Sequence, residues 1–529
     1  MPEPLFSDLD TQRLPQPQPP IARAGTAVTA FVGRALKGPI NLPTTVGSFD
    51  DYHRVFGGLW QPSMLSYAVE QYFENGGRVG VIVRVCNGGR ATSLSLRCGH
   101  STLELIGLSP GSREYLRAAV DYDGIDSADA DRFNLLIQRL RTAGSELVEE
   151  QEIFRRVSIA PGADRELTDA LSASKLVRLV GALPAQRPDR TLGPGGPGAV
   201  GYAVSNSDGD DGDALTNYDL IGDARKGTGV FALRSADPFN FLCLPSLART
   251  SDVGLPALLV ALRLCRERQA MLLVDPPTAW DTPAAAVEAV RHWPFHSENA
   301  LMFYPRLLAF DRLRGRYEQF GSAAAAAGML ARADELRPVW STAGNEEPML
   351  RAGLRLAATV SEVDRIRLSQ GGVNVLSSGR NRGHAHASLC TLLPEIAAKA
   401  AVRMLGARRF ALFVMTSIER GTRWVLFVHG GAPIWQQVRS QVAAFLEALE
   451  RDGAFAGRSA AESYFVVCDE RLNAPAALAR AQLRLLFGFA VSRAGDFETC
   501  LVTHQSAGSS VRAVSVNRYA LPAPAISAG

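Results

Sequence analysis

The feature that most limits how this chain can fold is the alternation of short apolar runs with helix-like segments. An apolar run at 27–32 is followed by a short helical segment at 49–56, by a longer one at 64–75 that stops at a glycine pair, and by a second apolar run at 79–86. Short apolar runs bounded by turn residues are typical of buried strands, and strand, helix and strand in succession predict a right-handed crossover. We therefore expect residues 26–91 to form an α/β unit.

The same alternation returns in the second half of the chain. Apolar runs at 241–244, 271–274 and 300–304 alternate with helical segments at 254–268 and 283–293. This pattern predicts an α/β layer with parallel strands. Residues 214–370 are expected to form this second α/β domain.

The C-terminal third predicts a mixed α+β domain over 371–503. The segments expected there, in chain order, are a helix at 392–405, strands at 411–415 and 424–428, a helix at 434–451, a strand at 464–468, and a hairpin that joins 483–490 to 497–502. The whole chain is thus expected to be a multidomain protein of α/β and α+β classes.

Four further segments differ in composition from these domains. Residues 92–184 carry short alternating segments between turn clusters, which predicts an inserted β-rich domain. Residues 185–213 are dense in Gly, Pro and Asp, as linkers are. Prolines at 15, 17, 19 and 20 favour an extended N-terminal arm over 1–25, and the small, polar residues of 504–529 predict a C-terminal arm.

Composition excludes several classes of protein. Of the 529 residues, 47% are hydrophobic and 21% are charged, which is an ordinary balance for a folded chain, and the net charge of +3 names neither nucleic acid nor an anionic membrane as a partner. No segment resembles a secretory signal or is long enough to insert into a bilayer. The seven dispersed cysteines are expected to be buried free thiols, which suits assembly in the cytoplasm.

Three patterns touch on chemistry, and none of them predicts a catalytic, cofactor-binding or metal-binding residue. Gly222 and Gly227 have the spacing of a phosphate loop, but lysine does not follow the second glycine, so we expect an ordinary loop before a strand at 230–233. His384 and His386 form a pair without a third ligand placed by spacing, and the acidic alternation at 206–210 lacks the later positions of a calcium loop. A nucleotide-dependent enzyme built on the layer at 230–304 remains the alternative from another functional class.

Four segments of the chain stand out in order: 26–39, 46–58, 68–85 and 215–244. They are followed near the end by a series of short motifs, and together they cover roughly two thirds of the chain. In this order they resemble the contractile tail sheath family. The motif positions are Gly33, Gly38, Phe56, Gly57, Gly76, Gly77, Asn374, Arg409, Glu419, Gly421, Thr422, Arg423, Trp424, Trp435 and Asp469. None of these residues requires chemistry, because glycines serve turns and tryptophans serve packing.

The resemblance implies a structural subunit and not an enzyme, with a tail-sheath-like core, an outward-facing inserted domain and two extended arms. Such a subunit forms six-membered rings with copies of itself, stacked around an inner tube protein and bounded by baseplate and cap proteins, without a cofactor, nucleic acid or direct membrane insertion. After cytoplasmic assembly the particle is a phage tail or an injection device, and lysis is one route by which it leaves the cell.

Arms in this family add strands to the sheets of neighbouring subunits. The residues expected to take part here are Leu14, Ile21, Val511, Val514, Val516 and Tyr519. The N-terminal arm departs from the family pattern, since its prolines remove the backbone donors that a sheet needs. This departure leaves open a second interpretation, a baseplate-end or cap protein that shares the sheath fold.

Overall fold

The computed structural model describes residues 19–193, 201–206, 208–341, 350–351, 354–376, 389–397, 403–427, 432–473 and 482–515. The chain divides into two compact units. Unit 1 comprises Met1–Gly25, Val339–Ala343 and Met404–Gly529, and unit 2 comprises Thr26–Pro338 and Gly344–Arg403.

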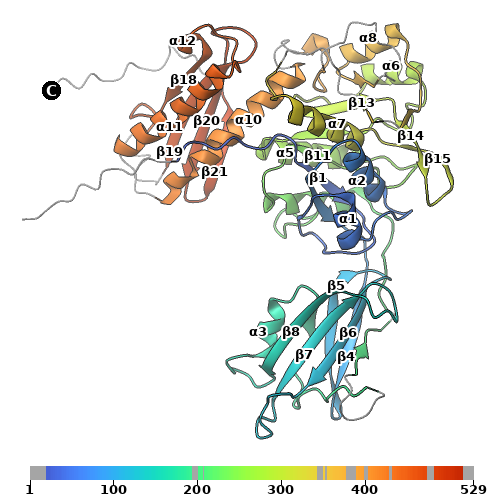
Figure 1. The fold of residues 1–529 in the computed structure, drawn as a ribbon. Helices are drawn as coiled ribbons and strands as arrows, with labels where there is room; N and C mark the ends of the chain where they lie inside the picture. The colour runs from blue at the N-terminus through green and yellow to red at the C-terminus, as the bar shows by residue number, and fades with distance from the viewer. Residues whose placement is uncertain are drawn as a thin grey trace, which may run out of the picture. The chain divides into compact units, whose positions relative to one another are not determined.

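A seven-stranded sheet is the centre of unit 2, within the part of the chain that is described (Figure 1). Its order is β17-β13-β12-β11-β1-β3-β2, and all neighbours are parallel except β2 and β3. The strands are β1 (Thr29–Gly33), β2 (Thr44–Val46), β3 (Gly80–Arg84), β11 (Phe241–Cys243), β12 (Met271–Val274), β13 (Ala300–Tyr304) and β17 (Asn374–Val375). Every residue of β1, β3, β11, β12 and β13 is buried, which explains why these strands are apolar runs in the sequence, apart from Thr29 and Arg84 at two strand ends.

Helices cover both faces of this sheet. On one face α2 (Met64–Glu74) packs against α7 (Ala323–Leu336), and Gly328 lets the two helices approach closely, because a Cβ there would lie 2.2 Å from the Tyr72 carbonyl oxygen. The other face is covered by α5 (Leu255–Glu267) and the 3-10 helix η1 (Gly229–Arg234). The remaining helices of unit 2 are α1 (Phe49–Phe56), α4 (Asn217–Ile221), α6 (Pro283–Arg291), α8 (Glu362–Gln370) and the 3-10 helix η2 (Glu395–Ala397).

Local signals account for the ends of the helices that were predicted. At the start of α1 the Ser48 hydroxyl accepts the Asp51 N–H, and at its end Gly57 takes a left-handed conformation with φ of 91°. At the start of α2 the Ser63 hydroxyl accepts the Ser66 N–H. The predictions for α1, α2, α5 and α6 are therefore confirmed to within a few residues.

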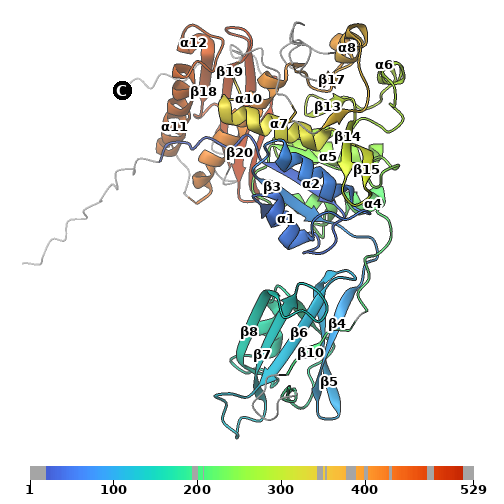
Figure 2. The same cartoon turned by 45° about the vertical axis from the view of Figure 1, so that its right-hand side comes forward.

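The segment expected to be β-rich forms two sheets around a common apolar core (Figure 2). One contains β4 (Ala91–Cys98), β5 (Ser101–Pro110) and β9 (Val177–Val180); the other contains β6 (Tyr115–Asp121), β7 (Arg132–Leu140), β8 (Val148–Ser158) and β10 (Ala203–Val204). A short helix, α3 (Leu167–Ser172), packs beside β8 and β9.

Residues 185–213 are more than a linker, which corrects the expectation from composition. Strand β10 pairs with β6, the Asp189 N–H bonds to the Arg97 carbonyl oxygen, and the Asp208 carboxylate accepts the Ser93 N–H at 3.0 Å. Asp and Asn side chains bond readily to nearby backbone groups, so a polar, glycine-rich segment can follow a sheet edge as well as span a gap. The described part of this segment is the return path of the β-rich domain.

A small sheet completes unit 2. It consists of β14 (Leu307–Asp311), β15 (Arg316–Phe320) and β16 (Arg355–Leu356), with β14 in the middle. All pairings are antiparallel.

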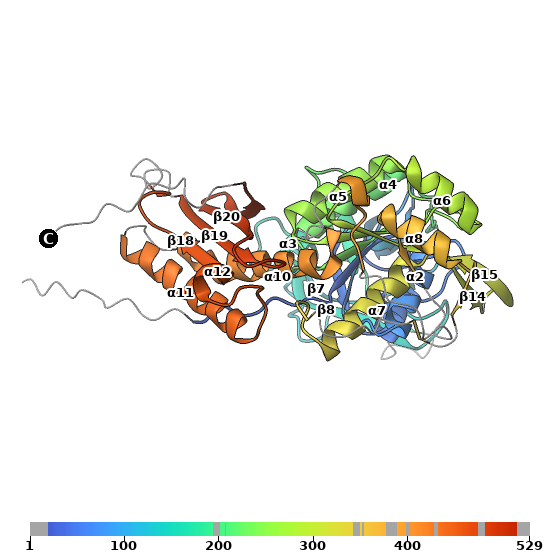
Figure 3. The ribbon, with the colours of Figure 1, turned by 90° about the horizontal axis from the view of Figure 1, so that it is seen from above.

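Unit 1 combines an antiparallel sheet with two long helices (Figure 3). The sheet order is β18 (Tyr464–Val467), β19 (Leu483–Ala490), β20 (Phe497–Gln505) and β21 (Gly508–Ala513). Helix α10 (Leu405–Gly421) packs against β20 and β21, α11 (Ala432–Arg451) packs against β18, and the short α12 (Ala460–Ser463) precedes β18. Phe410 and Phe413 of α10 join Phe445 of α11 and Phe489 of β19 in one aromatic cluster.

Two predicted elements of the C-terminal third are wrong. Residues 411–415 form the middle of α10 and no strand, because a helix buried on most sides has the same continuous apolar run as a buried strand. Residues 424–427 lie in the 3-10 helix η3 (Arg423–Phe427). The helix expected at 392–405 lies partly outside the described residues; its described part contains an isolated bridge at Leu392 and η2, and α10 begins at Leu405. The strand expected at 230–233 is likewise helical, in η1. The helix at 434–451, the strand at 464–468 and the hairpin are confirmed.

Candidate functional site

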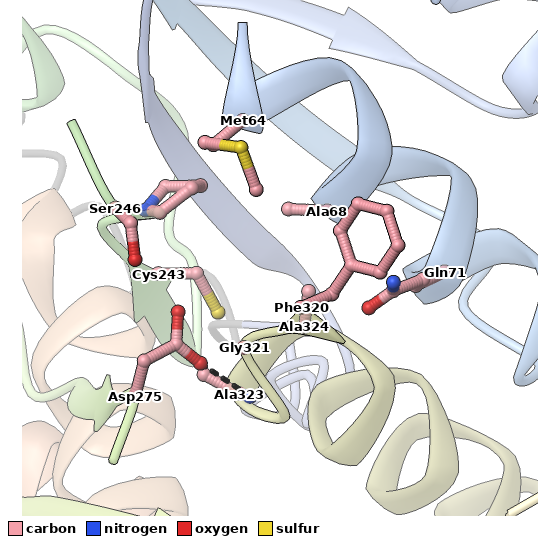
Figure 4. A pocket seen from close by; sticks show the side chains of 11 residues that line it. Met64, Ala68, Gln71, Cys243, Ser246, Asp275, Phe320, Gly321, Ala323 and Ala324 are labelled. Atoms are coloured by element: carbon pink, nitrogen blue, oxygen red, sulfur yellow. Dashed lines mark hydrogen bonds between the residues drawn. The ribbon is translucent and has the colours of Figure 1, made fainter. Parts of the chain in front are cut away.

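A small pocket lies at the carboxyl ends of β11 and β12, between α2 and α7 (Figure 4). The sheet order reverses at this point, because β3 lies on one side of β1 and β11 lies on the other. In open parallel sheets this is where small ligands usually bind. The pocket is therefore the natural location for the active site of an enzyme.

Its geometry does not suit a substrate. The cavity measures about 20 Å³, roughly the space of one water molecule. The Asp275 carboxylate accepts the Ala323 N–H at 2.8 Å, and a Cβ at Gly321 would lie 2.1 Å from the same carboxylate. The pocket is thus filled by the start of α7.

Burial shifts the pKa values of the pocket's two titratable groups, Asp275 and Cys243, toward the uncharged forms. Asp275 keeps part of its surface open to the pocket, yet it lies deep among protein atoms. The resulting desolvation raises the pKa of its carboxyl group, and the positive charge of Arg306 opposes this shift. Burial also raises the pKa of the Cys243 thiol far above its usual range. A neutral thiol is a poor nucleophile, so the pocket offers little catalytic chemistry.

The glycine loop at 222–228 cannot cradle a phosphate in the observed conformation. The Asp223 carboxylate accepts the N–H groups of Arg225 at 2.7 Å and Lys226 at 3.2 Å, and the Asp223 N–H itself bonds to the Thr228 hydroxyl at 2.8 Å. These are the backbone donors that a phosphate would need. The loop is an aspartate-stabilised turn.

No metal site is found in the described part of the chain, where no three His, Cys, Asp or Glu side chains gather suitably for one. In the alternating polar segment 206–210, the Asp208 carboxylate accepts hydrogen bonds from the N–H and from the hydroxyl of Ser93. Its oxygens are therefore used within the β-rich domain. His384 and His386 lie outside the described residues.

The motif glycines of the N-terminal part serve packing. Gly38 has a φ of 103° and lies against the ring of Phe56, where a Cβ would come within 2.8 Å. Gly77 lies under the ring of Tyr72, at a distance where a Cβ would collide. Gly33 and Gly76 fit closely against the side chains of Leu65 and Arg332 respectively. Gly57 ends α1, as described above.

Asn374 connects three segments of unit 2. Its amide nitrogen donates to the carbonyl oxygens of Cys390 at 2.8 Å and Met302 at 3.2 Å, and its amide oxygen accepts the Cys390 N–H at 2.8 Å. The side chain is 5% exposed. It therefore replaces the backbone partners that β13 and the segment near Cys390 lack at this point.

The motif at the end of α10 forms a polar network inside unit 1. The Arg423 guanidinium donates twice to the Glu419 carboxylate, at 2.8 and 2.9 Å. Thr422 Oγ1 donates to the Ile418 carbonyl oxygen at 2.7 Å and lies 2.8 Å from Nε2 of His504. Because the single hydroxyl proton is already used, Nε2 of His504 must carry a proton and donate to Thr422.

His504 is buried, with 1% of its surface exposed. Its second nitrogen, Nδ1, lies 2.7 Å from the Ser509 hydroxyl and accepts from it. Burial, and secondly the positive charge of Arg423, lowers the pKa of His504 to about 4. The imidazole is therefore neutral at physiological pH.

The remaining motif residues of unit 1 also contact their own unit. Trp424 Nε1 donates to Gln441 Oε1 at 3.0 Å, and the Asp469 carboxylate accepts the Arg471 guanidinium, which lowers the pKa of Asp469. Arg409 is half-buried on α10, and Trp435 is half-buried on α11.

Of the residues expected to exchange strands with a neighbouring subunit, Ile21, Val511 and Val514 have partners within their own chain, which corrects that expectation. Val511 belongs to β21 and pairs with Val502, and the Val514 N–H bonds to the Thr499 carbonyl oxygen. Ile21 is 7% exposed and contacts Gly421. A hairpin connection is short and satisfies the backbone within one chain, so β21 forms without a partner. Leu14, Val516 and Tyr519 lie outside the described residues.

Sequence reasoning missed the partners of these residues. His504 meets Thr422 across 82 positions, and the Ala24 N–H meets the Ser417 hydroxyl across 393. Neither pair has a local spacing signal, because both depend on how distant elements pack. The motif segment 417–424 was the available signal, and it marks one half of each pair.

The architecture of the chain is that of the contractile tail sheath proteins. It is similar to the sheath tail protein Lin1278 from Listeria innocua, with a TM-score of 0.58 and 11% identity over 92% of this chain and 97% of that one. It is also similar to a chain of the contracted PVC sheath complex, an extracellular contractile injection system, with a TM-score of 0.53 and 16% identity over 94% and 97%. A chain of the anti-feeding prophage baseplate matches with a TM-score of 0.50 and 16% identity over 90% and 93%.

No family model and no curated protein matches the sequence. The similarity is thus one of fold, at sequence identities of 11% to 16%. Across the described residues, no helix combines the length and apolar character needed to cross a membrane.

Proposed function

We propose that this chain is a sheath subunit of a contractile, phage-tail-like injection particle. It assembles with copies of itself as hexameric rings stacked around an inner tube protein, between baseplate and cap proteins, and its contraction drives the tube through a target envelope. The observation that carries the proposal is the similarity of fold, which extends over more than nine tenths of this chain and of the sheath proteins Lin1278 and PVC.

The pocket and the loops support a structural role. The cavity at the switch point is occupied by the start of α7, and the glycine loop uses its own N–H donors. A nucleotide bound at the switch point or at the glycine loop would need that place to be open. We therefore expect no thermal shift with ATP or NAD, although a ligand at 100 times its dissociation constant would stabilise the protein by about 2.7 kcal/mol.

The sheet of unit 1 offers a way to join subunits. Among the described residues β18 and β21 are its outer strands, and an outer strand presents unpaired backbone groups to a further strand. The arm segments outside the described residues are 1–18 and 516–529. The exchange therefore involves residues beyond β21, and Val511 and Val514 contribute as part of the receiving sheet.

A second candidate is a sheath-fold protein of the baseplate end. It is favoured by the similarity to a chain in the anti-feeding prophage baseplate and by the proline-rich N-terminal arm. The two candidates differ in copy number, since a sheath subunit repeats along the particle and a baseplate-end protein occupies one layer.

Negative-stain electron microscopy tests the proposal. The full chain is expressed alone and together with its neighbouring genes, beside a variant that lacks 516–529 and a control with Asp275→Asn. Long hollow tubes with six-fold end views are expected for the full chain and for the control, whereas the truncated chain should remain folded and form no long tubes. Single rings would favour the baseplate-end candidate, and separate monomers in every sample would contradict both.

A further inference from the structure

The segment before β1 is bound to unit 1 by several independent contacts. We refer to residues 19–24 as the strap. Ile21 is the only buried residue of the strap, with 7% of its surface exposed, and its neighbours Pro20 and Ala22 are exposed. A single buried apolar side chain between exposed neighbours is the pattern of a peptide held by one anchor.

The anchor fits a site on α10 that requires glycine. A Cβ at Gly421 would lie 2.7 Å from Cγ1 of Ile21 and 2.8 Å from its Cγ2. These distances are far below normal carbon contacts, so any side chain at 421 would expel Ile21. Gly421 is helical and has no positive φ, and its packing against Ile21 therefore gives a reason for glycine near the end of a helix.

Two polar contacts hold the backbone of the strap. The Ala24 N–H donates to the Ser417 hydroxyl at 3.0 Å, and that hydroxyl donates its own proton to the Phe413 carbonyl oxygen at 2.8 Å. On the other side of Ile21, Gln441 Nε2 donates to the Pro19 carbonyl oxygen at 2.7 Å. Trp424 holds the Gln441 amide in place, because its indole N–H donates to Oε1.

Arg23 adds a charged contact. Its guanidinium pairs with the Asp452 carboxylate, just after α11, and lies 5.5 Å from the centre of the Trp340 ring. Trp340 in turn packs on Phe410 and Phe413 of α10. The strap is thus held from both ends of a site that α10, α11 and Trp340 form together.

We propose that this site, which we call the strap seat, is a receptor that fixes the root of the N-terminal arm to unit 1 of the same chain. Ser417, Gly421 and Trp424, all in the motif segment 417–424, are its positioning residues. The N-terminal arm then departs from unit 1 and not from β1, although β1 follows the strap directly in sequence. If the arm binds a neighbouring subunit, as the proposed function requires, force on that contact passes through the strap seat to unit 1.

Limited trypsin digestion of the full chain tests the seat. Trypsin can cut after Arg23, within the strap, and after Arg13, which lies outside the described residues and serves as the internal reference. Variants Ile21→Ser and Gly421→Val remove the anchor from opposite sides, and Ala22→Ser, at an exposed position, is the matched control. The two N-termini that result are quantified by mass spectrometry.

Opening of the seat should raise the rate of cutting after Arg23 at least about tenfold in both anchor variants, without a change after Arg13. Ile21→Ser leaves α10 untouched, so it tests the seat even if Gly421→Val disturbs the helix. An unchanged rate after Arg23 in Ile21→Ser would overturn the proposal. Protection of Arg23 that grows with protein concentration would also overturn it, because it would assign the seat to the strap of a second copy.

Failure of the seat can be separated from failure of the proposed function. Digestion reports on the single chain, whereas electron microscopy of the same variants reports on assembly. Tubes formed by the wild-type chain with no change in digestion of the variants would reject the seat alone, and the expected change in digestion without tubes would reject the sheath function alone.

Discussion

The neutral, buried imidazole of His504 should make unit 1 sensitive to mild acid. Its pKa is about 4 in the folded protein, whereas an unfolded chain would give about 6.5. The unfolded state therefore binds the proton first, and the stability contributed by the neutral imidazole is present above pH 6.5 and is lost as the pH falls toward 4. The cause is first the burial of the ring, which leaves a charged imidazolium without water, and secondly the positive charge of Arg423.

The size of the effect follows from these two values. Between pH 7 and pH 5 the linkage relation gives a loss of about 2 kcal/mol in the free energy of unfolding. His504→Gln, which has no titrating group, should lack this loss, although it should be less stable at pH 7 by about 1 kcal/mol because one hydroxyl loses its partner.

Urea unfolding at pH 7 and pH 5, followed by tryptophan fluorescence, measures the difference. Unit 1 contains Trp340, Trp424 and Trp435, so its transition is visible in this signal. The control is His292→Gln, because the side chain of His292 is 80% exposed and should leave the pH dependence of the wild type unchanged. If His504→Gln retained the full pH dependence at an unchanged urea slope, the assignment of the proton to His504 would be refuted.

Three further predictions concern unit 2 and the thiols. Asn374→Ala should lower the free energy of unfolding by about 3 kcal/mol, because two carbonyl oxygens and the Cys390 N–H lose their partner in the interior, and urea unfolding measures the change. Arg84→Met should cost a similar amount, about 3 kcal/mol, since its buried guanidinium donates to the carbonyl oxygens of Gly38 and Pro110 at the base of the β-rich domain; an unchanged urea midpoint would contradict this. Ellman's reagent should react with one thiol quickly and with the other six slowly, because Cys86 is half-exposed whereas burial raises the pKa of each of the others, and Cys86→Ser should remove the fast phase.

Elements that are buried on both faces were predictable from the sequence. The runs at 271–274 and 300–304 match β12 and β13, because a parallel strand between two helical layers has no polar side and is short. Helix α1 was predictable to the residue, since Ser48 begins it and Gly57 ends it. In these cases the local sequence carries the complete physical reason for the element.

The same reasoning failed where burial surrounds a helix. The middle of α10 was interpreted as a strand, since the aromatic cluster of unit 1 and β21 cover most of its sides and remove the helical period of polar residues. The polar segment 185–213 was interpreted as a linker because its composition is that of a loop. The bonds of its described part to Ser93 and Arg90 are made across more than a hundred positions.

The sequence by itself predicted the fold class: the buried parallel strands and the free thiols follow from it, and its ordered motifs resemble the tail sheath family. Only the tertiary structure decided what residues 19–24 and 504–515, next to the two ends of the chain, contact. Val511 pairs within its own sheet and Ile21 lies against Gly421, although the sequence had marked both for exchange with a neighbour. The physical reason is that a strand or an apolar anchor is defined locally, whereas its partner is chosen by the packing of α10, α11 and the sheet of unit 1, which no short stretch of sequence encodes.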